Sequence, residues 1–282
     1  MLEQRSHCNH LRMCKGSWWE LWGKRQGKEC EQDGDEKDEQ PVAQDGKPLQ
    51  PPFLLSVKTN NNPLTPPSLP QHRSFLADQY RLQNKFSETK FIFPNAPSIP
   101  ITVNMGMRMP GWYDISDIGD LANRSSEDEP GILRSQKVFH TLIAEEIASG
   151  IPTERIVLGG FSQGGAMSLL AGITCPTKLG GIFGLSSYLL LRDKVQSLVP
   201  AESPNKGTGI FMGHGDSDPI VRYEWGQQTA AKLQEWGWKV DFRTYAGLVH
   251  SAAPQEIDDL EKYLMQKIPE VGDKPLGGGS GS

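Results

Sequence analysis

The chain has few cysteines, no excess of positive charge and no long apolar run. Four cysteines in 282 residues are too few for the disulfide framework of a small secreted protein. The formal net charge of −5 argues against a surface that binds nucleic acid, because phosphate binding depends on clustered Lys and Arg. No apolar run approaches the roughly 18 residues that span a bilayer, and the start "MLEQRSHCNH" lacks the apolar centre of a signal peptide. We therefore expect a soluble, cytoplasmic protein that binds no nucleic acid and contacts a membrane surface at most transiently.

The first 72 residues differ in composition from the rest of the chain. Residues 1–28 carry six Lys or Arg against two Glu, residues 29–39 carry seven acids against one Lys, and eight prolines follow between Pro41 and Pro70. Such charge blocks and proline-rich segments bury too little apolar surface to offset chain entropy. We therefore expect residues 1–72 to be disordered, and "PFLLSV" is the one stretch there with strand character.

Two groups of side chains in this segment suggest other roles. A zinc site is suggested by the loosely metal-like spacing of His7, Cys8, His10 and Cys14. These residues match no pattern with a named zinc geometry, so we predict no metal site. Contact with an anionic membrane is suggested by three tryptophans among basic residues, Trp18, Trp19 and Trp22. A disordered segment with isolated tryptophans explains them better.

From about residue 73 the sequence becomes periodic. Apolar residues recur at helical spacing in "PGILRSQKVFHTLIAEEIASG", which predicts a helix that Gly150 and Pro152 end. Short apolar runs such as "KFIFP", "RIVLGG", "GGIFGLS", "GIFMGHG" and "KVDFRTY" alternate with helical patterns, whereas residues 95–129 resemble a long loop. This alternation predicts an α/β domain over residues 73–270, with a mainly parallel sheet covered by helices on both faces. We expect residues 271–282, which end in "GGGSGS", to form a flexible tail.

One glycine-rich stretch presents a candidate nucleophile. Gly160-Phe161-Ser162-Gln163-Gly164 matches G-x-S-x-G, in which small residues permit a sharp strand-to-helix turn that exposes the serine hydroxyl. A random chain of this length and composition contains roughly 0.25 such matches, so the pattern needs its context. An apolar strand precedes the serine and a helix rich in small residues follows it, as this motif requires. We therefore predict a nucleophilic role for Ser162, against the alternative of an ordinary hydroxyl in a glycine-rich turn.

A nucleophilic serine needs a histidine base and a carboxylate that orients the histidine. In a sheet of this kind the partners follow later strands, in the order Ser, Asp or Glu, His. Asp216 and Asp218 follow the run "GIFMGHG", and His250 follows the run "KVDFRTY". His214 is a rival base and Asp216 a rival acid, and a surface turn or a plain loop histidine is the alternative for each position. The residues alone leave these alternatives open.

The stretch "NAPSIPITVNMGMRMPGWYD" is apolar and rich in methionine. Flexible methionine side chains suit an adaptable apolar groove, which we assign to Met105, Met107 and Met109. Trp112 is placed to wall one side of such a groove. A loop that merely covers the core is the alternative, because the stretch has no clear period.

Four blocks together carry a family resemblance. In chain order, "FIFPNAPSIPITVNMGMRMPGWYD", "IVLGGFSQGGAMSLL", "GHGDSDPIV" and "TYAGLVHSAAPQEI" resemble the acyl-protein thioesterases, which belong with related carboxylesterases and lysophospholipases to the α/β-hydrolases. The similarity covers about residues 75–268. It implies an α/β-hydrolase fold and a cytoplasmic enzyme that needs no metal or cofactor. Some members of the family are also present in the nucleus.

The resemblance also implies a substrate and a set of site residues. The substrates are S-palmitoylated proteins, and activity extends to lysophospholipids and small esters. The nucleophile corresponds to Ser162, the acid to Asp218 rather than Asp216, and the base to His250. The amide of Gln163 corresponds to the oxyanion donor that follows the nucleophile, and Trp112 with the methionine-rich stretch corresponds to the substrate-binding loop.

The chain departs from this family at its N-terminal end. Members normally begin with an apolar strand followed by an H-G-x-G-D loop whose backbone supplies a second oxyanion donor, whereas "TNNNPLTPPSLPQHRS" contains neither. We therefore expect the sheet to lack an N-terminal strand, and we hypothesise that residues 1 to about 72 come from a faulty gene model or an alternative splice form. The alternative function is an impaired hydrolase fold that only binds acylated partners.

Overall fold

The structure is a computed structural model. It describes residues 80, 82–87, 89–117 and 127–269, and the backbone of residues 53–57. All of these residues belong to one compact unit that spans residues 41–282. The predicted flexible tail, the metal-like spacing and the three tryptophans near the N-terminus lie outside the described residues. So does the predicted disorder of residues 1–72, except at residues 53–57.

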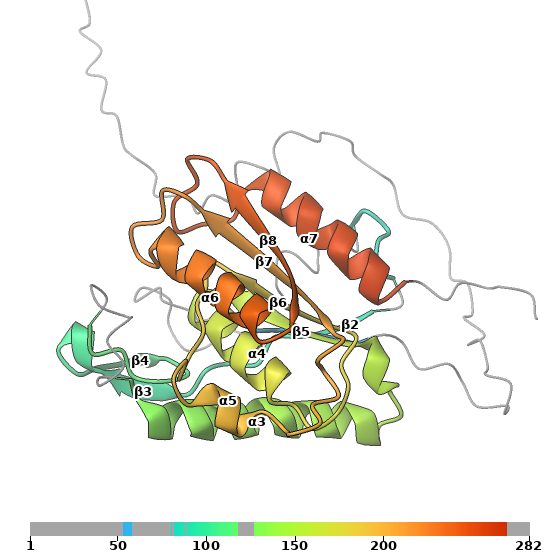
Figure 1. The fold of residues 1–282 in the computed structure, drawn as a ribbon, viewed down its shortest axis with the longest axis horizontal. Helices are drawn as coiled ribbons and strands as arrows, with labels where there is room; N and C mark the ends of the chain where they lie inside the picture. The colour runs from blue at the N-terminus through green and yellow to red at the C-terminus, as the bar shows by residue number, and fades with distance from the viewer. Residues whose placement is uncertain (1–52, 58–79, 81, 88, 118–126, 270–282) are drawn as a thin grey trace, which may run out of the picture. The chain divides into compact units, whose positions relative to one another are not determined.

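The centre of the fold is a six-stranded sheet in which every pair of neighbouring strands is parallel (Figure 1). The strand order is β2-β1-β5-β6-β7-β8. The strands are β1 (Phe53–Val57), β2 (Lys90–Ile92), β5 (Ile156–Phe161), β6 (Gly181–Leu185), β7 (Gly209–Gly215) and β8 (Lys239–Tyr245). The prediction of a mainly parallel sheet is confirmed.

The expectation that the sheet lacks an N-terminal strand is wrong. Strand β1 lies between β2 and β5, and its backbone pairs from Phe53 opposite Ile156 to Val57 opposite Gly160. A strand in this position satisfies backbone groups of β2 and β5 that would otherwise be unpaired. The α/β domain therefore takes a strand from a segment that we expected to be disordered. Residues 58–79, where an oxyanion loop would follow β1, are outside the described residues.

Helices cover both faces of the sheet, as the alternating pattern predicted. Side chains of successive strand residues point to opposite faces. In β5, Ile156 and Leu158 therefore join one core cluster and Val157 joins the other. The first cluster contains side chains of α3 (Glu129–Ala148), α4 (Gln163–Ile173), α5 (Val195–Leu198) and α6 (Tyr223–Glu235), and the second contains side chains of α7 (Pro254–Lys267).

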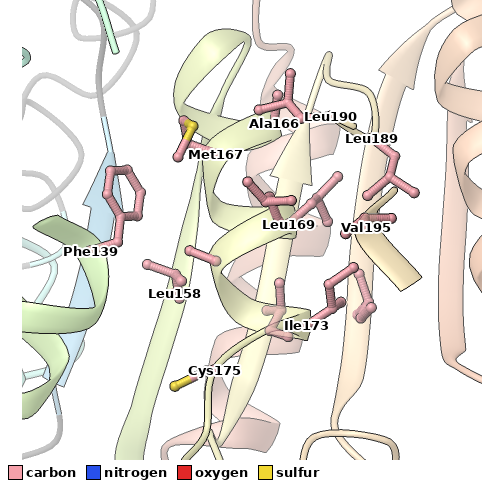
Figure 2. Packing of buried hydrophobic residues seen from close by; sticks show 14 of the residues in the cluster. Phe139, Leu158, Ala166, Met167, Leu169, Ile173, Cys175, Leu189, Leu190 and Val195 are labelled. Carbon is pink, nitrogen blue, oxygen red and sulfur yellow. The ribbon is translucent and has the colours of Figure 1, made fainter. Parts of the chain in front are cut away.

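Helix α4 lies at the centre of the larger cluster. All of its residues are buried, and Figure 2 shows its side chains Met167, Leu169 and Ile173 in one group with Leu158 of β5. A helix that is buried on all sides has an apolar sequence without an amphipathic pattern. The start of this helix is therefore held rigidly against the sheet.

Helix α3 confirms the helix predicted from spacing, and it begins with an aspartate cap. The Asp128 carboxylate accepts a hydrogen bond from the Gly131 N–H at 2.9 Å, which satisfies one of the free donors of the first turn. Pro130 occupies the first turn, where its missing N–H has no cost. Phe139 and Ile143 are buried against the sheet. No helix of the described residues is long and apolar enough to cross a membrane.

The segment predicted as a long loop contains an antiparallel hairpin. Strands β3 (Ser98–Ile101) and β4 (Met107–Pro110) pair with each other, joined through the 3-10 turn η1 (Thr102–Asn104). The turn ends at Met105 in a left-handed conformation with φ 56°. The hairpin is separate from the main sheet (Figure 1). Its sequence therefore lacks the apolar periodicity of the helices and strands that form the core.

Candidate active site

Ser162 occupies a sharp turn between β5 and α4. Its φ of 54° and ψ of −125° are unusual for a residue with a side chain, and its N–H donates to the Leu185 carbonyl at 2.8 Å. Glycine is required close by, since a Cβ on Gly165 would lie 2.8 Å from the Gly160 carbonyl oxygen. This is the strained strand-to-helix turn that the G-x-S-x-G pattern predicts.

Ser162, His250 and Asp218 form a continuous hydrogen-bonded chain. The Ser162 hydroxyl lies 3.0 Å from His250 Nε2, and His250 Nδ1 lies 2.7 Å from Asp218 Oδ2. Because an ionised carboxylate only accepts, Nδ1 carries the proton and Nε2 is free to accept from the serine. The imidazole ring also packs on Phe161, with ring centroids 4.8 Å apart. The structure thus brings together the three residues to which the family resemblance assigns these roles.

The environment of Asp218 favours its ionised form. Burial acts to raise the pKa of this carboxyl, but the hydrogen bond and charge of His250 and the N–H groups of Ile220 and Val221 lower it below the ordinary value. Both N–H groups donate to Asp218 Oδ1 at 2.9 Å. One carboxylate oxygen is therefore held by the backbone while the other receives His250.

The two alternative residues, Asp216 and His214, make other contacts. Asp216 is exposed, and its carboxylate accepts from the Gly247 N–H at 2.7 Å. His214 is fully buried and donates from Nε2 to the Val221 carbonyl at 2.8 Å. Burial lowers the pKa of His214, so this ring stays neutral. Both residues shape the turns that carry Asp218 and His250.

Gln163, the first residue of α4, combines a free backbone donor with a fully engaged side chain. The N–H groups of a first helical turn have no carbonyl within the helix to bond, and that of Gln163 follows directly on the nucleophile. The side-chain amide points elsewhere. Its Oε1 accepts from the Trp112 N–H at 2.9 Å, and its Nε2 donates to the Tyr113 carbonyl at 2.8 Å. The backbone N–H is thus the group of Gln163 available to an oxyanion.

The structure places the Trp112 ring in the core, whereas we expected it to wall one side of a groove. Only 2% of Trp112 is exposed, and its indole packs edge-on against Phe139 in the main core, with ring centroids 4.9 Å apart. A large aromatic surface is worth more in the core than at a solvent-facing wall, and α3 supplies the partner. Unlike Trp112, Met105 and Met107 are exposed on the hairpin, by 89% and 58%. Met109 is half-buried, with its sulfur 2.9 Å from Asn104 Nδ2.

One buried acid near the site was missed by sequence reasoning. Glu256 lies in the first turn of α7, is fully buried, and packs against β7 so closely that a Cβ on Gly213 would meet it at 2.4 Å. The sequence signal at this position, a glutamate in the first turn of a helix, is typical of an exposed capping residue. Only the packing of α7 on the sheet buries it.

The arrangement can perform nucleophilic acyl transfer. A serine activated by a neutral histidine attacks a carbonyl carbon, and N–H groups at a helix start stabilise the negative oxygen that develops. Among the described residues, no group of three or more His, Cys, Asp or Glu side chains is arranged to hold a metal ion.

Comparisons with known proteins identify the family of this chain. A family model described as phospholipase/carboxylesterase matches residues 71–268. The chain is 55% identical over 199 residues to acyl-protein thioesterase 1 of Neurospora crassa, covering 70% of this chain and 81% of that protein. It is 51% identical over 206 residues to the Aspergillus fumigatus protein of the same name, covering 71% and 86%.

Solved structures share the fold. Arabidopsis thaliana SOBER1 superimposes with a TM-score of 0.67 at 30% identity, covering 77% of this chain and 99% of that one. Acyl-protein thioesterase 2 of Zea mays superimposes with a TM-score of 0.62 at 23% identity, covering 78% and 94%. With a family match over residues 71–268 and a serine, histidine and aspartate in hydrogen-bonded order, the chain belongs to the phospholipase/carboxylesterase family of α/β-hydrolases.

Proposed function

We propose that this chain is a serine hydrolase that cleaves long-chain acyl thioesters from protein cysteines. The single observation that carries the proposal is the hydrogen-bonded chain from Ser162 through His250 to Asp218, at 3.0 and 2.7 Å. The thioester preference is supported by the similarity to proteins named acyl-protein thioesterase 1. The exposed Met105 and Met107 suit contact with a fatty acyl chain.

The proposed reaction runs through an acyl-enzyme. His250 Nε2 takes the hydroxyl proton as Ser162 Oγ attacks the thioester carbonyl, and the Gln163 N–H donates to the oxyanion. The C–S bond then breaks, and the departing sulfur receives the proton from the imidazolium. Water, deprotonated by His250, attacks the acyl-serine ester and releases the fatty acid, and the proton returns to Ser162. Asp218 stabilises the imidazolium in both halves of the reaction.

Lysophospholipids and small carboxylic esters are proposed as secondary substrates. They present the same carbonyl to Ser162, and the matching family is described as phospholipase/carboxylesterase. Alkoxide leaving groups are poorer than thiolates, so they depend more on protonation by His250.

The impaired hydrolase is the competing function. It is motivated by the absence of an H-G-x-G-D sequence, since loss of one oxyanion donor typically costs about 10²–10³ in turnover. The presence of β1 in the sheet removes the other reason for expecting an impaired fold. The similarity to named thioesterases favours the active enzyme.

The test uses the full chain, a fluorophosphonate probe and a palmitoylated peptide thioester. We expect wild type to label and to release the free thiol, and Ser162→Ala to do neither while keeping its circular dichroism spectrum. Labelling without thioester turnover would refute the thioesterase assignment. A folded wild type that does not label would support the impaired hydrolase.

A further inference from the structure

The Gln163 side chain joins the nucleophile turn to the base of the β3–β4 hairpin. Only 8% of Gln163 is exposed, and both polar atoms of its amide bond the backbone of adjacent residues, Trp112 and Tyr113. The direction of the amide is fixed by its partners, because an N–H can only donate and a carbonyl can only accept. The contact therefore specifies glutamine rather than any polar residue of that length.

The segment at Trp112 and Tyr113 is a junction between the hairpin and the core. The Ser135 hydroxyl of α3 donates to the Trp112 carbonyl, and the Trp112 ring packs on Phe139. Beyond this junction the hairpin projects Met105 and Met107 into solvent. The position of these methionines relative to Ser162 therefore depends on how the junction is held.

We propose that the Gln163 side chain is a positioning residue that sets the hairpin against the nucleophile and thereby determines the preference for long acyl chains. This inference rests on the proposed function. Under this proposal a short acyl group reacts at Ser162 without reaching the hairpin, whereas a long chain contacts both. Loss of the two side-chain hydrogen bonds should therefore weaken long-chain substrates most, while the backbone N–H of residue 163 remains.

The experiment measures kcat and KM on p-nitrophenyl acetate, butyrate and octanoate for Gln163→Met, with active sites counted by fluorophosphonate titration. Methionine keeps the length of the side chain but leaves the buried Trp112 N–H and Tyr113 carbonyl without partners. The loss of two neutral hydrogen bonds corresponds to a change of about 5- to 150-fold in a binding constant. We expect the loss in kcat/KM on octanoate to exceed the loss on acetate by a factor of that size, mainly through KM.

Gln136→Met is the matched control. Gln136 is a partly buried glutamine whose amide donates to Thr174 Oγ1 at 2.6 Å, and this contact does not involve the nucleophile turn. We expect this variant to show no dependence on chain length. For Gln163→Met, equal losses on all three esters, or no loss, would overturn the proposal.

Gln163→Glu keeps the inference testable if the methionine variant does not fold. Its carboxylate accepts from the Trp112 N–H but presents an oxygen to the Tyr113 carbonyl, and protonation restores the missing donor. We expect the ratio of the octanoate KM of this variant to that of wild type to fall as the pH falls from 8 to 6. A ratio that does not change with pH would overturn the proposal. Because the esters are not thioesters, failure of wild type on palmitoyl thioesters would refute the proposed function alone.

Discussion

Glu256→Gln should stabilise the protein progressively relative to wild type as the pH rises from 5 to 8. Glu256 is fully buried, and neither carboxyl oxygen has a hydrogen-bond partner among the described residues. Burial raises the pKa of Glu256 to about 8, against 4.5 for a free glutamate, and the negative charge of Asp218 adds to this. The nearby Ala253 N–H favours the ionised form without making a well-aligned hydrogen bond, and it does not offset the burial. The folded protein thus keeps a proton that the unfolded chain has released.

The size of the effect follows from linkage between protonation and folding. Because the folded pKa of Glu256 lies above the unfolded one, stability falls progressively as the pH rises from about 4.5, where the unfolded chain loses the proton, to about 8, where the folded protein loses it. One pKa unit corresponds to 1.36 kcal/mol, so the difference in unfolding free energy between Glu256→Gln and wild type should grow by about 2–4 kcal/mol between pH 5 and pH 8. Glutamine has nearly the same volume and does not ionise, so the packing against β7 is kept.

Urea unfolding followed by tryptophan fluorescence at pH 5, 6, 7 and 8 measures this difference. Glu145→Gln is the matched control, since Glu145 is an exposed residue of α3. The control should differ from wild type by less than about 0.5 kcal/mol, with little change over the same range. If Glu256→Gln gains no stability over wild type between pH 5 and pH 8, the reasoning about the buried proton is wrong.

Two further predictions test the catalytic chain and its turn. Asp218→Asn should lower kcat on the order of 10³–10⁴-fold, because the amide no longer holds His250 in the required tautomer, whereas Asp216→Asn should lower it less than about tenfold. Equal losses in a steady-state ester assay would show that the acid has been misassigned. Gly165→Ala should cost about 1–3 kcal/mol, because its Cβ would lie 2.8 Å from a backbone oxygen. Gly207→Ala, with no atom within 4 Å of the added carbon, should cost less than about 0.5 kcal/mol in thermal unfolding. Similar melting temperatures for the two alanine variants would contradict the steric argument.

Local patterns predicted the elements whose signals are local. The helix α3 follows from a regular apolar spacing over 20 residues, and the turn at Ser162 follows from small residues between a strand and a helix. The strand β1 has only five residues within a proline-rich segment, so its local signal is weak. Its place in the sheet comes from pairing with β2 and β5, which lie far along the chain.

The sequence by itself determined the α/β class, the nucleophile and the order in which its partners follow, because these depend on periodicity and on residue types at fixed spacing. Residue types and spacing left Asp216 and Asp218, and His214 and His250, as alternatives, and only the family resemblance favoured Asp218 and His250. The tertiary structure hydrogen-bonds these two to each other, since residues two positions apart in a turn point in different directions. It also places Trp112 in the core instead of at a groove, and it buries the carboxyl of Glu256 without a hydrogen-bond partner among the described residues. The reason is the same in each case. Burial and hydrogen bonding of a side chain are set by elements distant in sequence, which no local pattern contains.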